Sequence, residues 1–176
     1  IGEFVERAWQ AATSGYPGPV HLSLPVDIMF SSFEADAGRN ERPWIRHQVA
    51  PQRAWPEPAR LSEILKIIEN SERPLIIGGH GVWWSRSEKS LAEVGEKLLI
   101  PIFNVPYHTK LLGEDCTANM GLADFHQYHP SKAAIQEADT IIMIGGRLDN
   151  QMNFGNPPFI PQNTKLICIN GSSEEL

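Results

Sequence analysis

Two glycine-rich segments directly follow apolar runs, and both could hold a phosphate group. The first is Gly78-Gly79-His80-Gly81, and the second is Gly145-Gly146-Arg147. Glycines let the backbone approach a phosphate closely and leave amide N–H groups to bind it. The planar guanidinium of Arg147 suits a phosphate or pyrophosphate, and an ion pair with Asp149 or a neighbouring acid is the alternative interpretation.

The first glycine segment departs from the dinucleotide-binding fingerprint. In the pattern G-x-G-x-x-G counted from Gly79, Trp84 takes the last place, and an indole cannot make the close helix–strand contact that glycine allows. A classical NAD site is therefore not expected here, and a tight turn without a ligand is the alternative. Asn170 follows the last apolar run and can hydrogen-bond a ribose hydroxyl, although more weakly than a carboxylate would.

Other reactive residues form no recognisable catalytic centre. His126 and His129 have a spacing that a metal site could use, but no third ligand stands nearby in the sequence. The sequence contains neither the G-x-S-x-G motif nor the G-x-x-x-x-G-K-[ST] motif. We therefore predict no catalytic residue and no metal ligand in this chain. The adjacent Trp83 and Trp84 could stack on a flat ring, but covering an interface is the preferred interpretation.

Four short, continuous apolar runs must position these residues. They lie at residues 74–77, 100–103, 140–144 and 166–169. Strands that are apolar on both faces are typical of a parallel sheet covered by helices. The pattern predicts an α/β fold, a three-layer doubly wound parallel sheet that is Rossmann-like, with ligands at the carboxyl ends of its strands.

Helical spacing separates the predicted strands. Pro58 suits a helix first turn, and an apolar face follows it, formed by Leu61, Ile64, Leu65 and Ile68. The segment Ser85-Arg86-Ser87-Glu88 has capping-box spacing, with Leu91, Val94 and Leu98 on one face behind it. Ser131 is the expected cap of a third helix that carries Ala134, Ile135 and Ala138.

Composition excludes several classes of partner. The chain has 176 residues, 41% of them apolar, which suffices for one domain and the remnant of a second. Its 15 basic and 21 acidic side chains give a net charge of −6, which argues against a nucleic acid or an anionic membrane. Two cysteines, Cys116 and Cys168, form no disulfide framework. They fit a cytoplasmic location, and we expect both to be small buried apolar groups.

The chain divides into three parts. Residues 1–29 contain a predicted helix over 3–14 and a predicted strand over 20–24, too little to bury its own faces. Residues 30–57 are rich in proline and read as an interdomain connector. Residues 58–176 hold the alternating helices and strands. The first residues already have helical spacing and the last have the composition of a segment that precedes another element, so we expect the chain to be a piece of a longer protein.

Several segments together resemble thiamine-diphosphate-dependent enzymes of the acetolactate synthase and 2-hydroxyacyl-CoA lyase type. The run A-x-S-G-x-P-G-P-V-x-L-x-L-P-x-D over residues 12–27 is similar to the closing helix and strand of the family's pyrimidine-binding domain. The residues similar to the family's central domain lie at 73–81, 99–102, 137–139 and 145–149. The resemblance implies that residues 1–29 are a remnant of the first domain and that residues 58–176 are the central Rossmann-like domain.

The resemblance also implies a parent enzyme that uses thiamine diphosphate and Mg²⁺. Such enzymes act on 2-oxo acids or 2-hydroxyacyl compounds by decarboxylation, carboligation or C–C cleavage. The family's catalytic glutamate lies earlier in the first domain, and its Gly-Asp-Gly motif, absent from this sequence, lies in the third. The chain is thus expected to be a scaffold that contacts the pyrimidine- and pyrophosphate-binding domains of a cytoplasmic homo-oligomer.

A nucleotide is a further implication of the resemblance. Flavin-binding members carry an acid pair around the last strand, where this chain has Asn170 and Ser172. The run from Arg147 to Pro158 also resembles the 2-hydroxyacyl-CoA lyase and oxalyl-CoA decarboxylase branch, whose central domain can hold ADP or part of coenzyme A. FAD, ADP and an empty site are therefore alternatives. The candidate cofactor-binding residues are Gly78, Gly79, Gly81, His126, Arg147 and Asn170.

Two functions from other classes compete with this interpretation. One is a free-standing nucleotide-binding or regulatory Rossmann-like module with no catalytic partner. The other is a structural interaction domain that self-associates through the connector and the Trp83-Trp84 pair. Titration with FAD, ADP and NAD distinguishes the nucleotide-binding module from the scaffold domain. Light scattering, which measures self-association, identifies the structural interaction domain.

Overall fold

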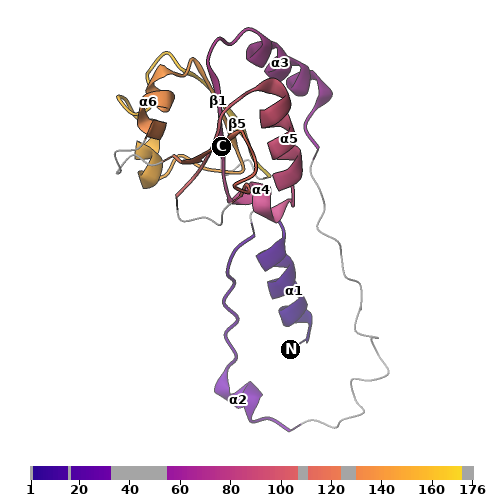
Figure 1. Ribbon diagram of the computed structural model, residues 1–176. Helices are drawn as coiled ribbons and strands as arrows, with labels where there is room; N and C mark the ends of the chain where they lie inside the picture. Colours follow the sequence, from indigo (N-terminus) through magenta and orange to yellow (C-terminus); the bar gives the residue numbers. More distant parts are fainter. Residues whose placement is uncertain (1, 16, 33–54, 107–110, 124–129, 172–176) are drawn as a thin grey trace. The chain divides into compact units, whose positions relative to one another are not determined.

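The computed structural model describes residues 2–15, 17–32, 55–106, 111–123 and 130–171. The chain forms two compact units, residues 1–54 and residues 55–176. The first unit contains helix α1 (Gly2–Thr13) and the short helix α2 (Val26–Met29) (Figure 1). Residues 20–24 are not a strand, contrary to the prediction from their alternation. A strand is defined by its ladder, and the described residues of this unit supply no partner for one.

The second unit is built around a five-stranded sheet in which every pairing is parallel, as predicted. The strand order is β3-β2-β1-β4-β5. The strands are β1 (Pro74–Gly78), β2 (Ile102–Asn104), β3 (Asn119–Leu122), β4 (Thr140–Ile144) and β5 (Lys165–Ile169). The four apolar runs therefore mark four of these strands. The edge strand β3 was not foreseen, because it is short and largely exposed.

Helices cover both faces of this sheet. They are α3 (Pro58–Glu69), α4 (His80–Trp84), α5 (Glu88–Leu98), α6 (Pro130–Glu137) and the 3₁₀ segment η1 (Asn150–Gly155). In Figure 1, α6 lies on one side of the sheet and α3 and α5 lie on the other. Successive residues of β1 belong to different buried clusters, Leu75 and Ile77 to the α6 side and Ile76 to the α3 and α5 side. The three-layer α/β prediction is confirmed.

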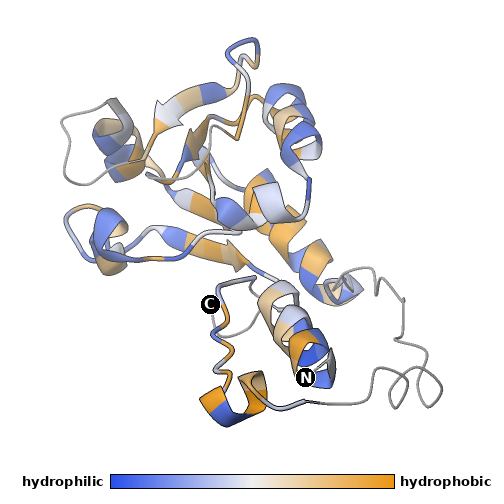
Figure 2. Ribbon diagram, turned by 90° about the horizontal axis from the view of Figure 1, so that it is seen from below, coloured by the Kyte–Doolittle hydropathy of each residue, from blue (hydrophilic) through white to orange (hydrophobic). Residues whose placement is uncertain are grey.

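Hydrophobic residues run through the sheet, whereas the helices carry both classes of residue (Figure 2). On α3 the partly buried residues are Ile64, Ile67 and Ile68, whereas Leu61 and Leu65 are exposed. The predicted four-residue face was therefore only half correct. On α5, Leu91 is buried as expected, but the rest of the predicted face is exposed. The buried line of α5 continues through Gly95, which has no side chain to reveal it.

Both predicted serine caps are corrected by the structure. The capping-box spacing predicted Ser85 as the cap of a helix with Glu88 in its third position, but α5 begins at Glu88, and Ser87 at the N-cap position makes no side-chain cap hydrogen bond. The Ser87 hydroxyl instead lies 2.7 Å from the Ser85 hydroxyl, which also donates to the Gly81 carbonyl. Helix α6 already includes Ser131, which is buried inside the first turn rather than preceding it. Ser85 lies before the N-cap position of α5 and Ser131 lies after the start of α6, so neither predicted serine occupies the N-cap position.

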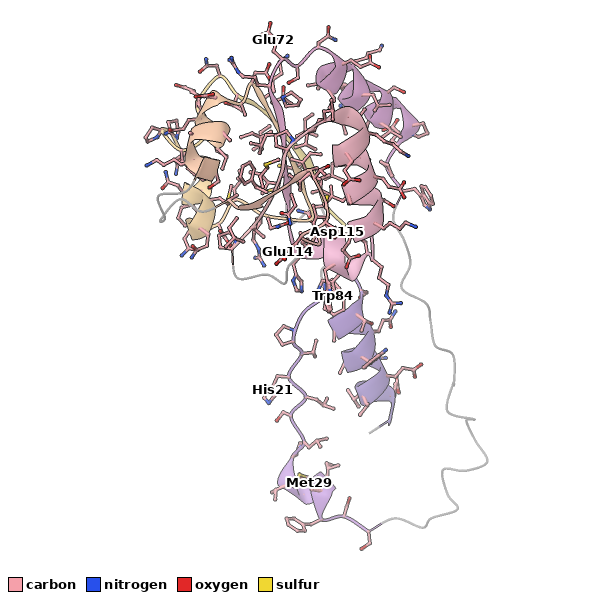
Figure 3. The ribbon with its side chains drawn as sticks, in the orientation of Figure 1. His21, Met29, Glu72, Trp84, Glu114 and Asp115 are labelled. Carbon is pink, nitrogen blue, oxygen red and sulfur yellow. The ribbon has the colours of Figure 1, made fainter. Side chains whose placement is uncertain are left out.

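Asp139 fixes the amino edge of the sheet, at the end of β1 marked by Glu72 in Figure 3. Its carboxylate accepts hydrogen bonds from the Ser71 hydroxyl, from the Glu72 amide at 2.7 Å and from the Arg73 amide at 3.2 Å. The Ser71 hydrogen bond is the largest influence, and together these contacts hold the pKa of Asp139 below the ordinary value of an aspartate. The carboxylate thereby joins the loop before β1 to the start of β4.

Replacing Asp139 by asparagine is expected to make stability less dependent on acid. A carboxylate with a lowered folded-state pKa contributes its full stabilisation above the unfolded pKa, about 3.9, and loses it as pH falls through the folded value. The variant should therefore be less stable than the parent at pH 7, and the gap should shrink below about pH 4. Urea unfolding at pH 7 and below about pH 4 measures the free energy of unfolding of both proteins. A difference between them that does not change with pH would contradict the prediction.

Candidate functional site

The carboxyl edge of the sheet contains a topological switch point between β1 and β4. The connection after β1 leads to α4 and α5 on one face, whereas the connection after β4 leads to η1, whose Met152 belongs to the cluster on the other face. β1 and β4 are neighbours, paired from Pro74–Thr140 to Gly78–Ile144. Ligands of doubly wound sheets bind outside such switch points. Gly79, Gly81, Arg147 and Asn170 all follow strands at this edge.

The glycines at this edge contact one another through their backbones. The Gly79 amide donates to the Ile144 carbonyl at 2.8 Å, and the Gly81 amide donates to the Gly145 carbonyl at 2.8 Å. We call the group Gly79, Gly81, Gly145 and Gly146 the glycine clasp. The expectation that the Gly79 and Gly81 amides point to a ligand is thus corrected, because neighbouring carbonyls already accept from them. No nest of unpaired amides forms at these two positions.

Backbone crowding explains why three of the four clasp positions, Gly79, Gly81 and Gly145, are glycine. A Cβ placed on Gly79 would lie 2.3 Å from the Gly146 Cα and 2.4 Å from the Gly145 oxygen. A Cβ on Gly81 would lie 2.7 Å from the Gly145 Cα. Gly145 also has φ +63°, in the left-handed region that favours glycine. Gly78 serves packing instead, since its Cβ would lie 3.0 Å from a Leu111 methyl group.

Asn170 completes the edge beside the clasp. Its Nδ2 donates to the Gly146 carbonyl at 2.7 Å, and the side chain is half-buried. The preceding Ile169 carbonyl accepts from the Gly145 amide at 2.8 Å. These bonds fix the end of β5 against the turn after β4. Asn170 therefore orients the turn that carries Arg147, in addition to any contact with a ligand.

Arg147 is an exposed cation at this edge. It follows the clasp directly, and Asp149 two residues later accepts a hydrogen bond from the Gln151 amide at 2.9 Å. This bond caps η1, so the carboxylate of Asp149 has a structural role in the crossover. Of the other predicted site residues, His126 lies outside the described residues, as does His129. The structure thus brings together Gly79, Gly81, Arg147 and Asn170.

An aromatic cluster stands on α4 at the same edge, where Figure 3 labels Trp84. The His80 ring lies 5.2 Å from the Trp83 ring and 5.9 Å from the Trp84 ring, measured between centroids. The two indoles meet edge to face at 5.0 Å and stay about two-fifths exposed, at 42% and 44%. The contact of the two indoles with the His80 ring was not predicted, because the sequence pattern indicates a glycine-rich turn around His80 and does not predict helix α4.

The cysteines are less buried than expected. Cys116 and Cys168 are both half-buried free thiols that pack at the margins of the two core clusters. Partial burial raises the pKa of the Cys168 thiol. Within the described residues, no three acidic, histidine or cysteine side chains gather as a metal site would require. No helix in that same part of the chain is long and apolar enough to cross a membrane.

A sequence model of the family "Thiamine pyrophosphate enzyme, central domain" matches residues 61–176. The chain is 28% identical to 2-hydroxyacyl-CoA lyase 1 from Dictyostelium discoideum over 172 residues, which cover 95% of this chain and 27% of that protein. It is 27% identical to a probable acetolactate synthase large subunit from Methanococcus aeolicus over 182 residues, covering 100% and 29%. The chain therefore spans less than a third of the length of these relatives.

Solved structures agree on the fold. Benzoylformate decarboxylase from Polynucleobacter necessarius has a TM-score of 0.71 at 24% identity, covering 99% of this chain and 31% of that one. The thiamine diphosphate-dependent 4-hydroxybenzoylformate decarboxylase from Rhodococcus jostii RHA1 has a TM-score of 0.75 at 15% identity, covering 98% and 32%. At these identities the likeness concerns the arrangement of the elements alone.

Proposed function

Because this chain belongs to the thiamine pyrophosphate enzyme family, as a central domain, we propose that it is the supporting layer of a longer thiamine-diphosphate-dependent enzyme. The parent would act on 2-oxo acids or 2-hydroxyacyl compounds, by decarboxylation, carboligation or C–C cleavage. The family match over residues 61–176 carries this proposal. The relatives that support it are a 2-hydroxyacyl-CoA lyase and an acetolactate synthase subunit.

The residues that the structure describes do not form a site that fits thiamine diphosphate and Mg²⁺. The sequence has no Gly-Asp-Gly, and no metal-binding group of side chains forms among the described residues. We therefore assign both to neighbouring pyrimidine- and pyrophosphate-binding domains of the parent and derive no chemical step through them. The domain boundaries 1–29, 30–57 and 58–176 belong to the same proposal. The chain's own contribution is a rigid sheet that separates and orients those domains.

The parent gene tests this assignment. We expect the reading frame to continue beyond Leu176 into a Gly-Asp-Gly segment followed by an asparagine. The full-length product should decarboxylate a 2-oxo acid or cleave a 2-hydroxyacyl-CoA only when thiamine diphosphate and Mg²⁺ are added. A reading frame without that segment, whose product binds NAD tightly, would instead identify a free-standing nucleotide-binding module.

The carboxyl edge is the proposed place for an ADP group, either free ADP or the adenine half of FAD. Since carbonyls already accept from the Gly79 and Gly81 amides, the phosphate contact would come from the Arg147 guanidinium. Asn170 would face the ribose with its half-buried amide. The absorbance spectrum of the full-length protein separates the two forms, because FAD has a visible band and ADP has none.

Replacing Arg147 by alanine is expected to weaken ADP or FAD binding by about 1–3 kcal/mol, since a charge-assisted contact is lost. Calorimetric titration of the unsubstituted chain and of the variant measures this difference in binding free energy. Arg60→Ala is the matched control, because Arg60 is an exposed arginine of α3 that pairs with Glu63 at 3.0 Å. Equal affinities for the parent chain and Arg147→Ala would remove Arg147 from the site.

A cytoplasmic homo-oligomer is the remaining part of the proposal. The two free cysteines support a reducing compartment. The exposed indoles of Trp83 and Trp84 support burial against another surface in the parent. Light scattering of the full-length protein tests the assembly, and a monomer would contradict it.

A further inference from the structure

The η1 segment holds two non-glycine residues in the left-handed backbone region. Asn153 has φ 50° and ψ 34°, and Phe154 has φ 51° and ψ 26°. Asparagine enters this region readily, but an aromatic residue does so rarely, at a cost of about 1–2 kcal/mol. The cost must be offset by the surroundings, because an unconstrained loop would relax.

Hydrogen bonds and packing keep the segment in this conformation. The Phe154 amide donates to the Asp149 carbonyl at 2.8 Å, and the Asn156 amide donates to the Asn153 carbonyl at 2.9 Å. Met152 is completely buried beneath the segment. Gly155 follows with φ +73° and lies so close to Leu148 that a Cβ would sit 2.8 Å from its methyl group. The backbone is therefore fixed independently of the phenyl ring.

The phenyl ring itself gains little from the fold. Phe154 is 64% exposed, so the burial of its ring does not compensate the backbone strain. A single exposed apolar residue needs no explanation, but a strained one does. Its sequence neighbours Asn150, Gln151, Asn153 and Asn156 are all amides. An isolated ring among amides is unlike the wide apolar patch that docks another protein.

The backbone that carries the ring folds back toward the segment of the proposed phosphate-binding cation. The Phe154–Asp149 hydrogen bond closes the loop two residues after Arg147, and the Gly155–Leu148 contact brings the chain back beside the residue next to Arg147. Arg147 is also exposed. The crossover between β4 and β5 thus carries both an exposed guanidinium and an exposed aromatic ring, the two groups that a phosphate-bearing aromatic base requires.

We propose that Phe154 stacks on the base of a nucleotide bound at this edge. This role explains why a phenylalanine is present although its left-handed backbone conformation lowers the stability of the fold. This inference rests on the proposed ADP site and adds the contact that would recognise the adenine ring. Stacking needs a ring at a fixed position, which the constrained segment supplies.

Three variants of the 176-residue chain test the inference, each titrated calorimetrically with ADP and with FAD and each melted without ligand. Phe154→Gly removes the ring and the strain, so binding should weaken about tenfold while the melting temperature rises by about 1–3 °C. Phe154→Leu keeps the strain, so it should lose affinity without gaining stability. Asn153→Gly is the matched control, next to Phe154 and equally left-handed, and it should leave affinity unchanged.

The outcomes separate this inference from the proposal beneath it. If the unsubstituted 176-residue chain binds ADP and Phe154→Gly binds it equally well, the stacking role of Phe154 is wrong, whereas the proposed ADP site is supported. If Phe154→Gly melts about 5 °C or more below the parent chain, the ring serves packing and the inference is wrong. If the unsubstituted 176-residue chain binds neither ADP nor FAD, both the proposed nucleotide site and the proposed role of Phe154 are wrong.

Discussion

Replacing Gly79 by alanine is expected to lower the free energy of unfolding by about 3 kcal/mol or more, the upper end for overpacked positions. The added Cβ would lie 2.3 Å from the Gly146 Cα and 2.4 Å from the Gly145 oxygen. Both are backbone atoms next to β4, which is paired with β1 along its whole length. Neither strand can move aside without breaking that ladder, so the clasp would have to open.

Gly146→Ala is the matched control for this prediction. Its Cβ would meet a Met143 side chain at 3.3 Å, a contact that a flexible side chain can relieve. We expect a change below about 1 kcal/mol, within the range of tolerated core adjustments. Urea unfolding followed by tryptophan fluorescence compares the two variants. Equal midpoints for Gly79→Ala and the parent chain would show that the clasp is not tightly packed.

The sheet was predictable from sequence because its inner strands are apolar on both faces. Residues 140–144 form such a run, and they became β4 without adjustment. β3 could not be found in this way. In its sequence Asn-Met-Gly-Leu the two apolar residues are separated by a glycine with φ +90°, and an edge strand needs no continuous apolar run. Pairing with β2, visible only in the fold, defines it.

The glycine positions were predictable, but their role was not. The sequence shows that Gly79 and Gly145 each follow a strand, and both readings of such glycines, phosphate cradle or tight turn, fit that position. The pairing of β1 with β4, which the sequence does not show, brings the two turns together. There the Gly79 and Gly81 amides donate to carbonyls of the other turn and are no longer available to a ligand. The same limit applies to Phe154, because no local pattern distinguishes an exposed phenylalanine in a left-handed conformation from an ordinary loop residue.

Replacing Phe159 by alanine is expected to lower the free energy of unfolding by about 3–5 kcal/mol, as for other buried aromatic side chains. Phe159 is the largest completely buried side chain of the described chain, and it shares a cluster with Met152. Both residues belong to the crossover between β4 and β5, and their burial holds that crossover against the sheet. The cavity would therefore loosen the loop that presents Arg147 and Phe154.

This coupling gives the variant a second readout. If the crossover forms the nucleotide site, Phe159→Ala should weaken ADP binding even at a temperature where the variant is still folded, although Phe159 is itself buried. Leu98→Ala on α5 is the control, since Leu98 is 54% exposed and should change stability by less than about 0.5 kcal/mol. A folded Phe159→Ala variant with full ADP affinity would show that the site does not depend on how firmly its crossover is packed.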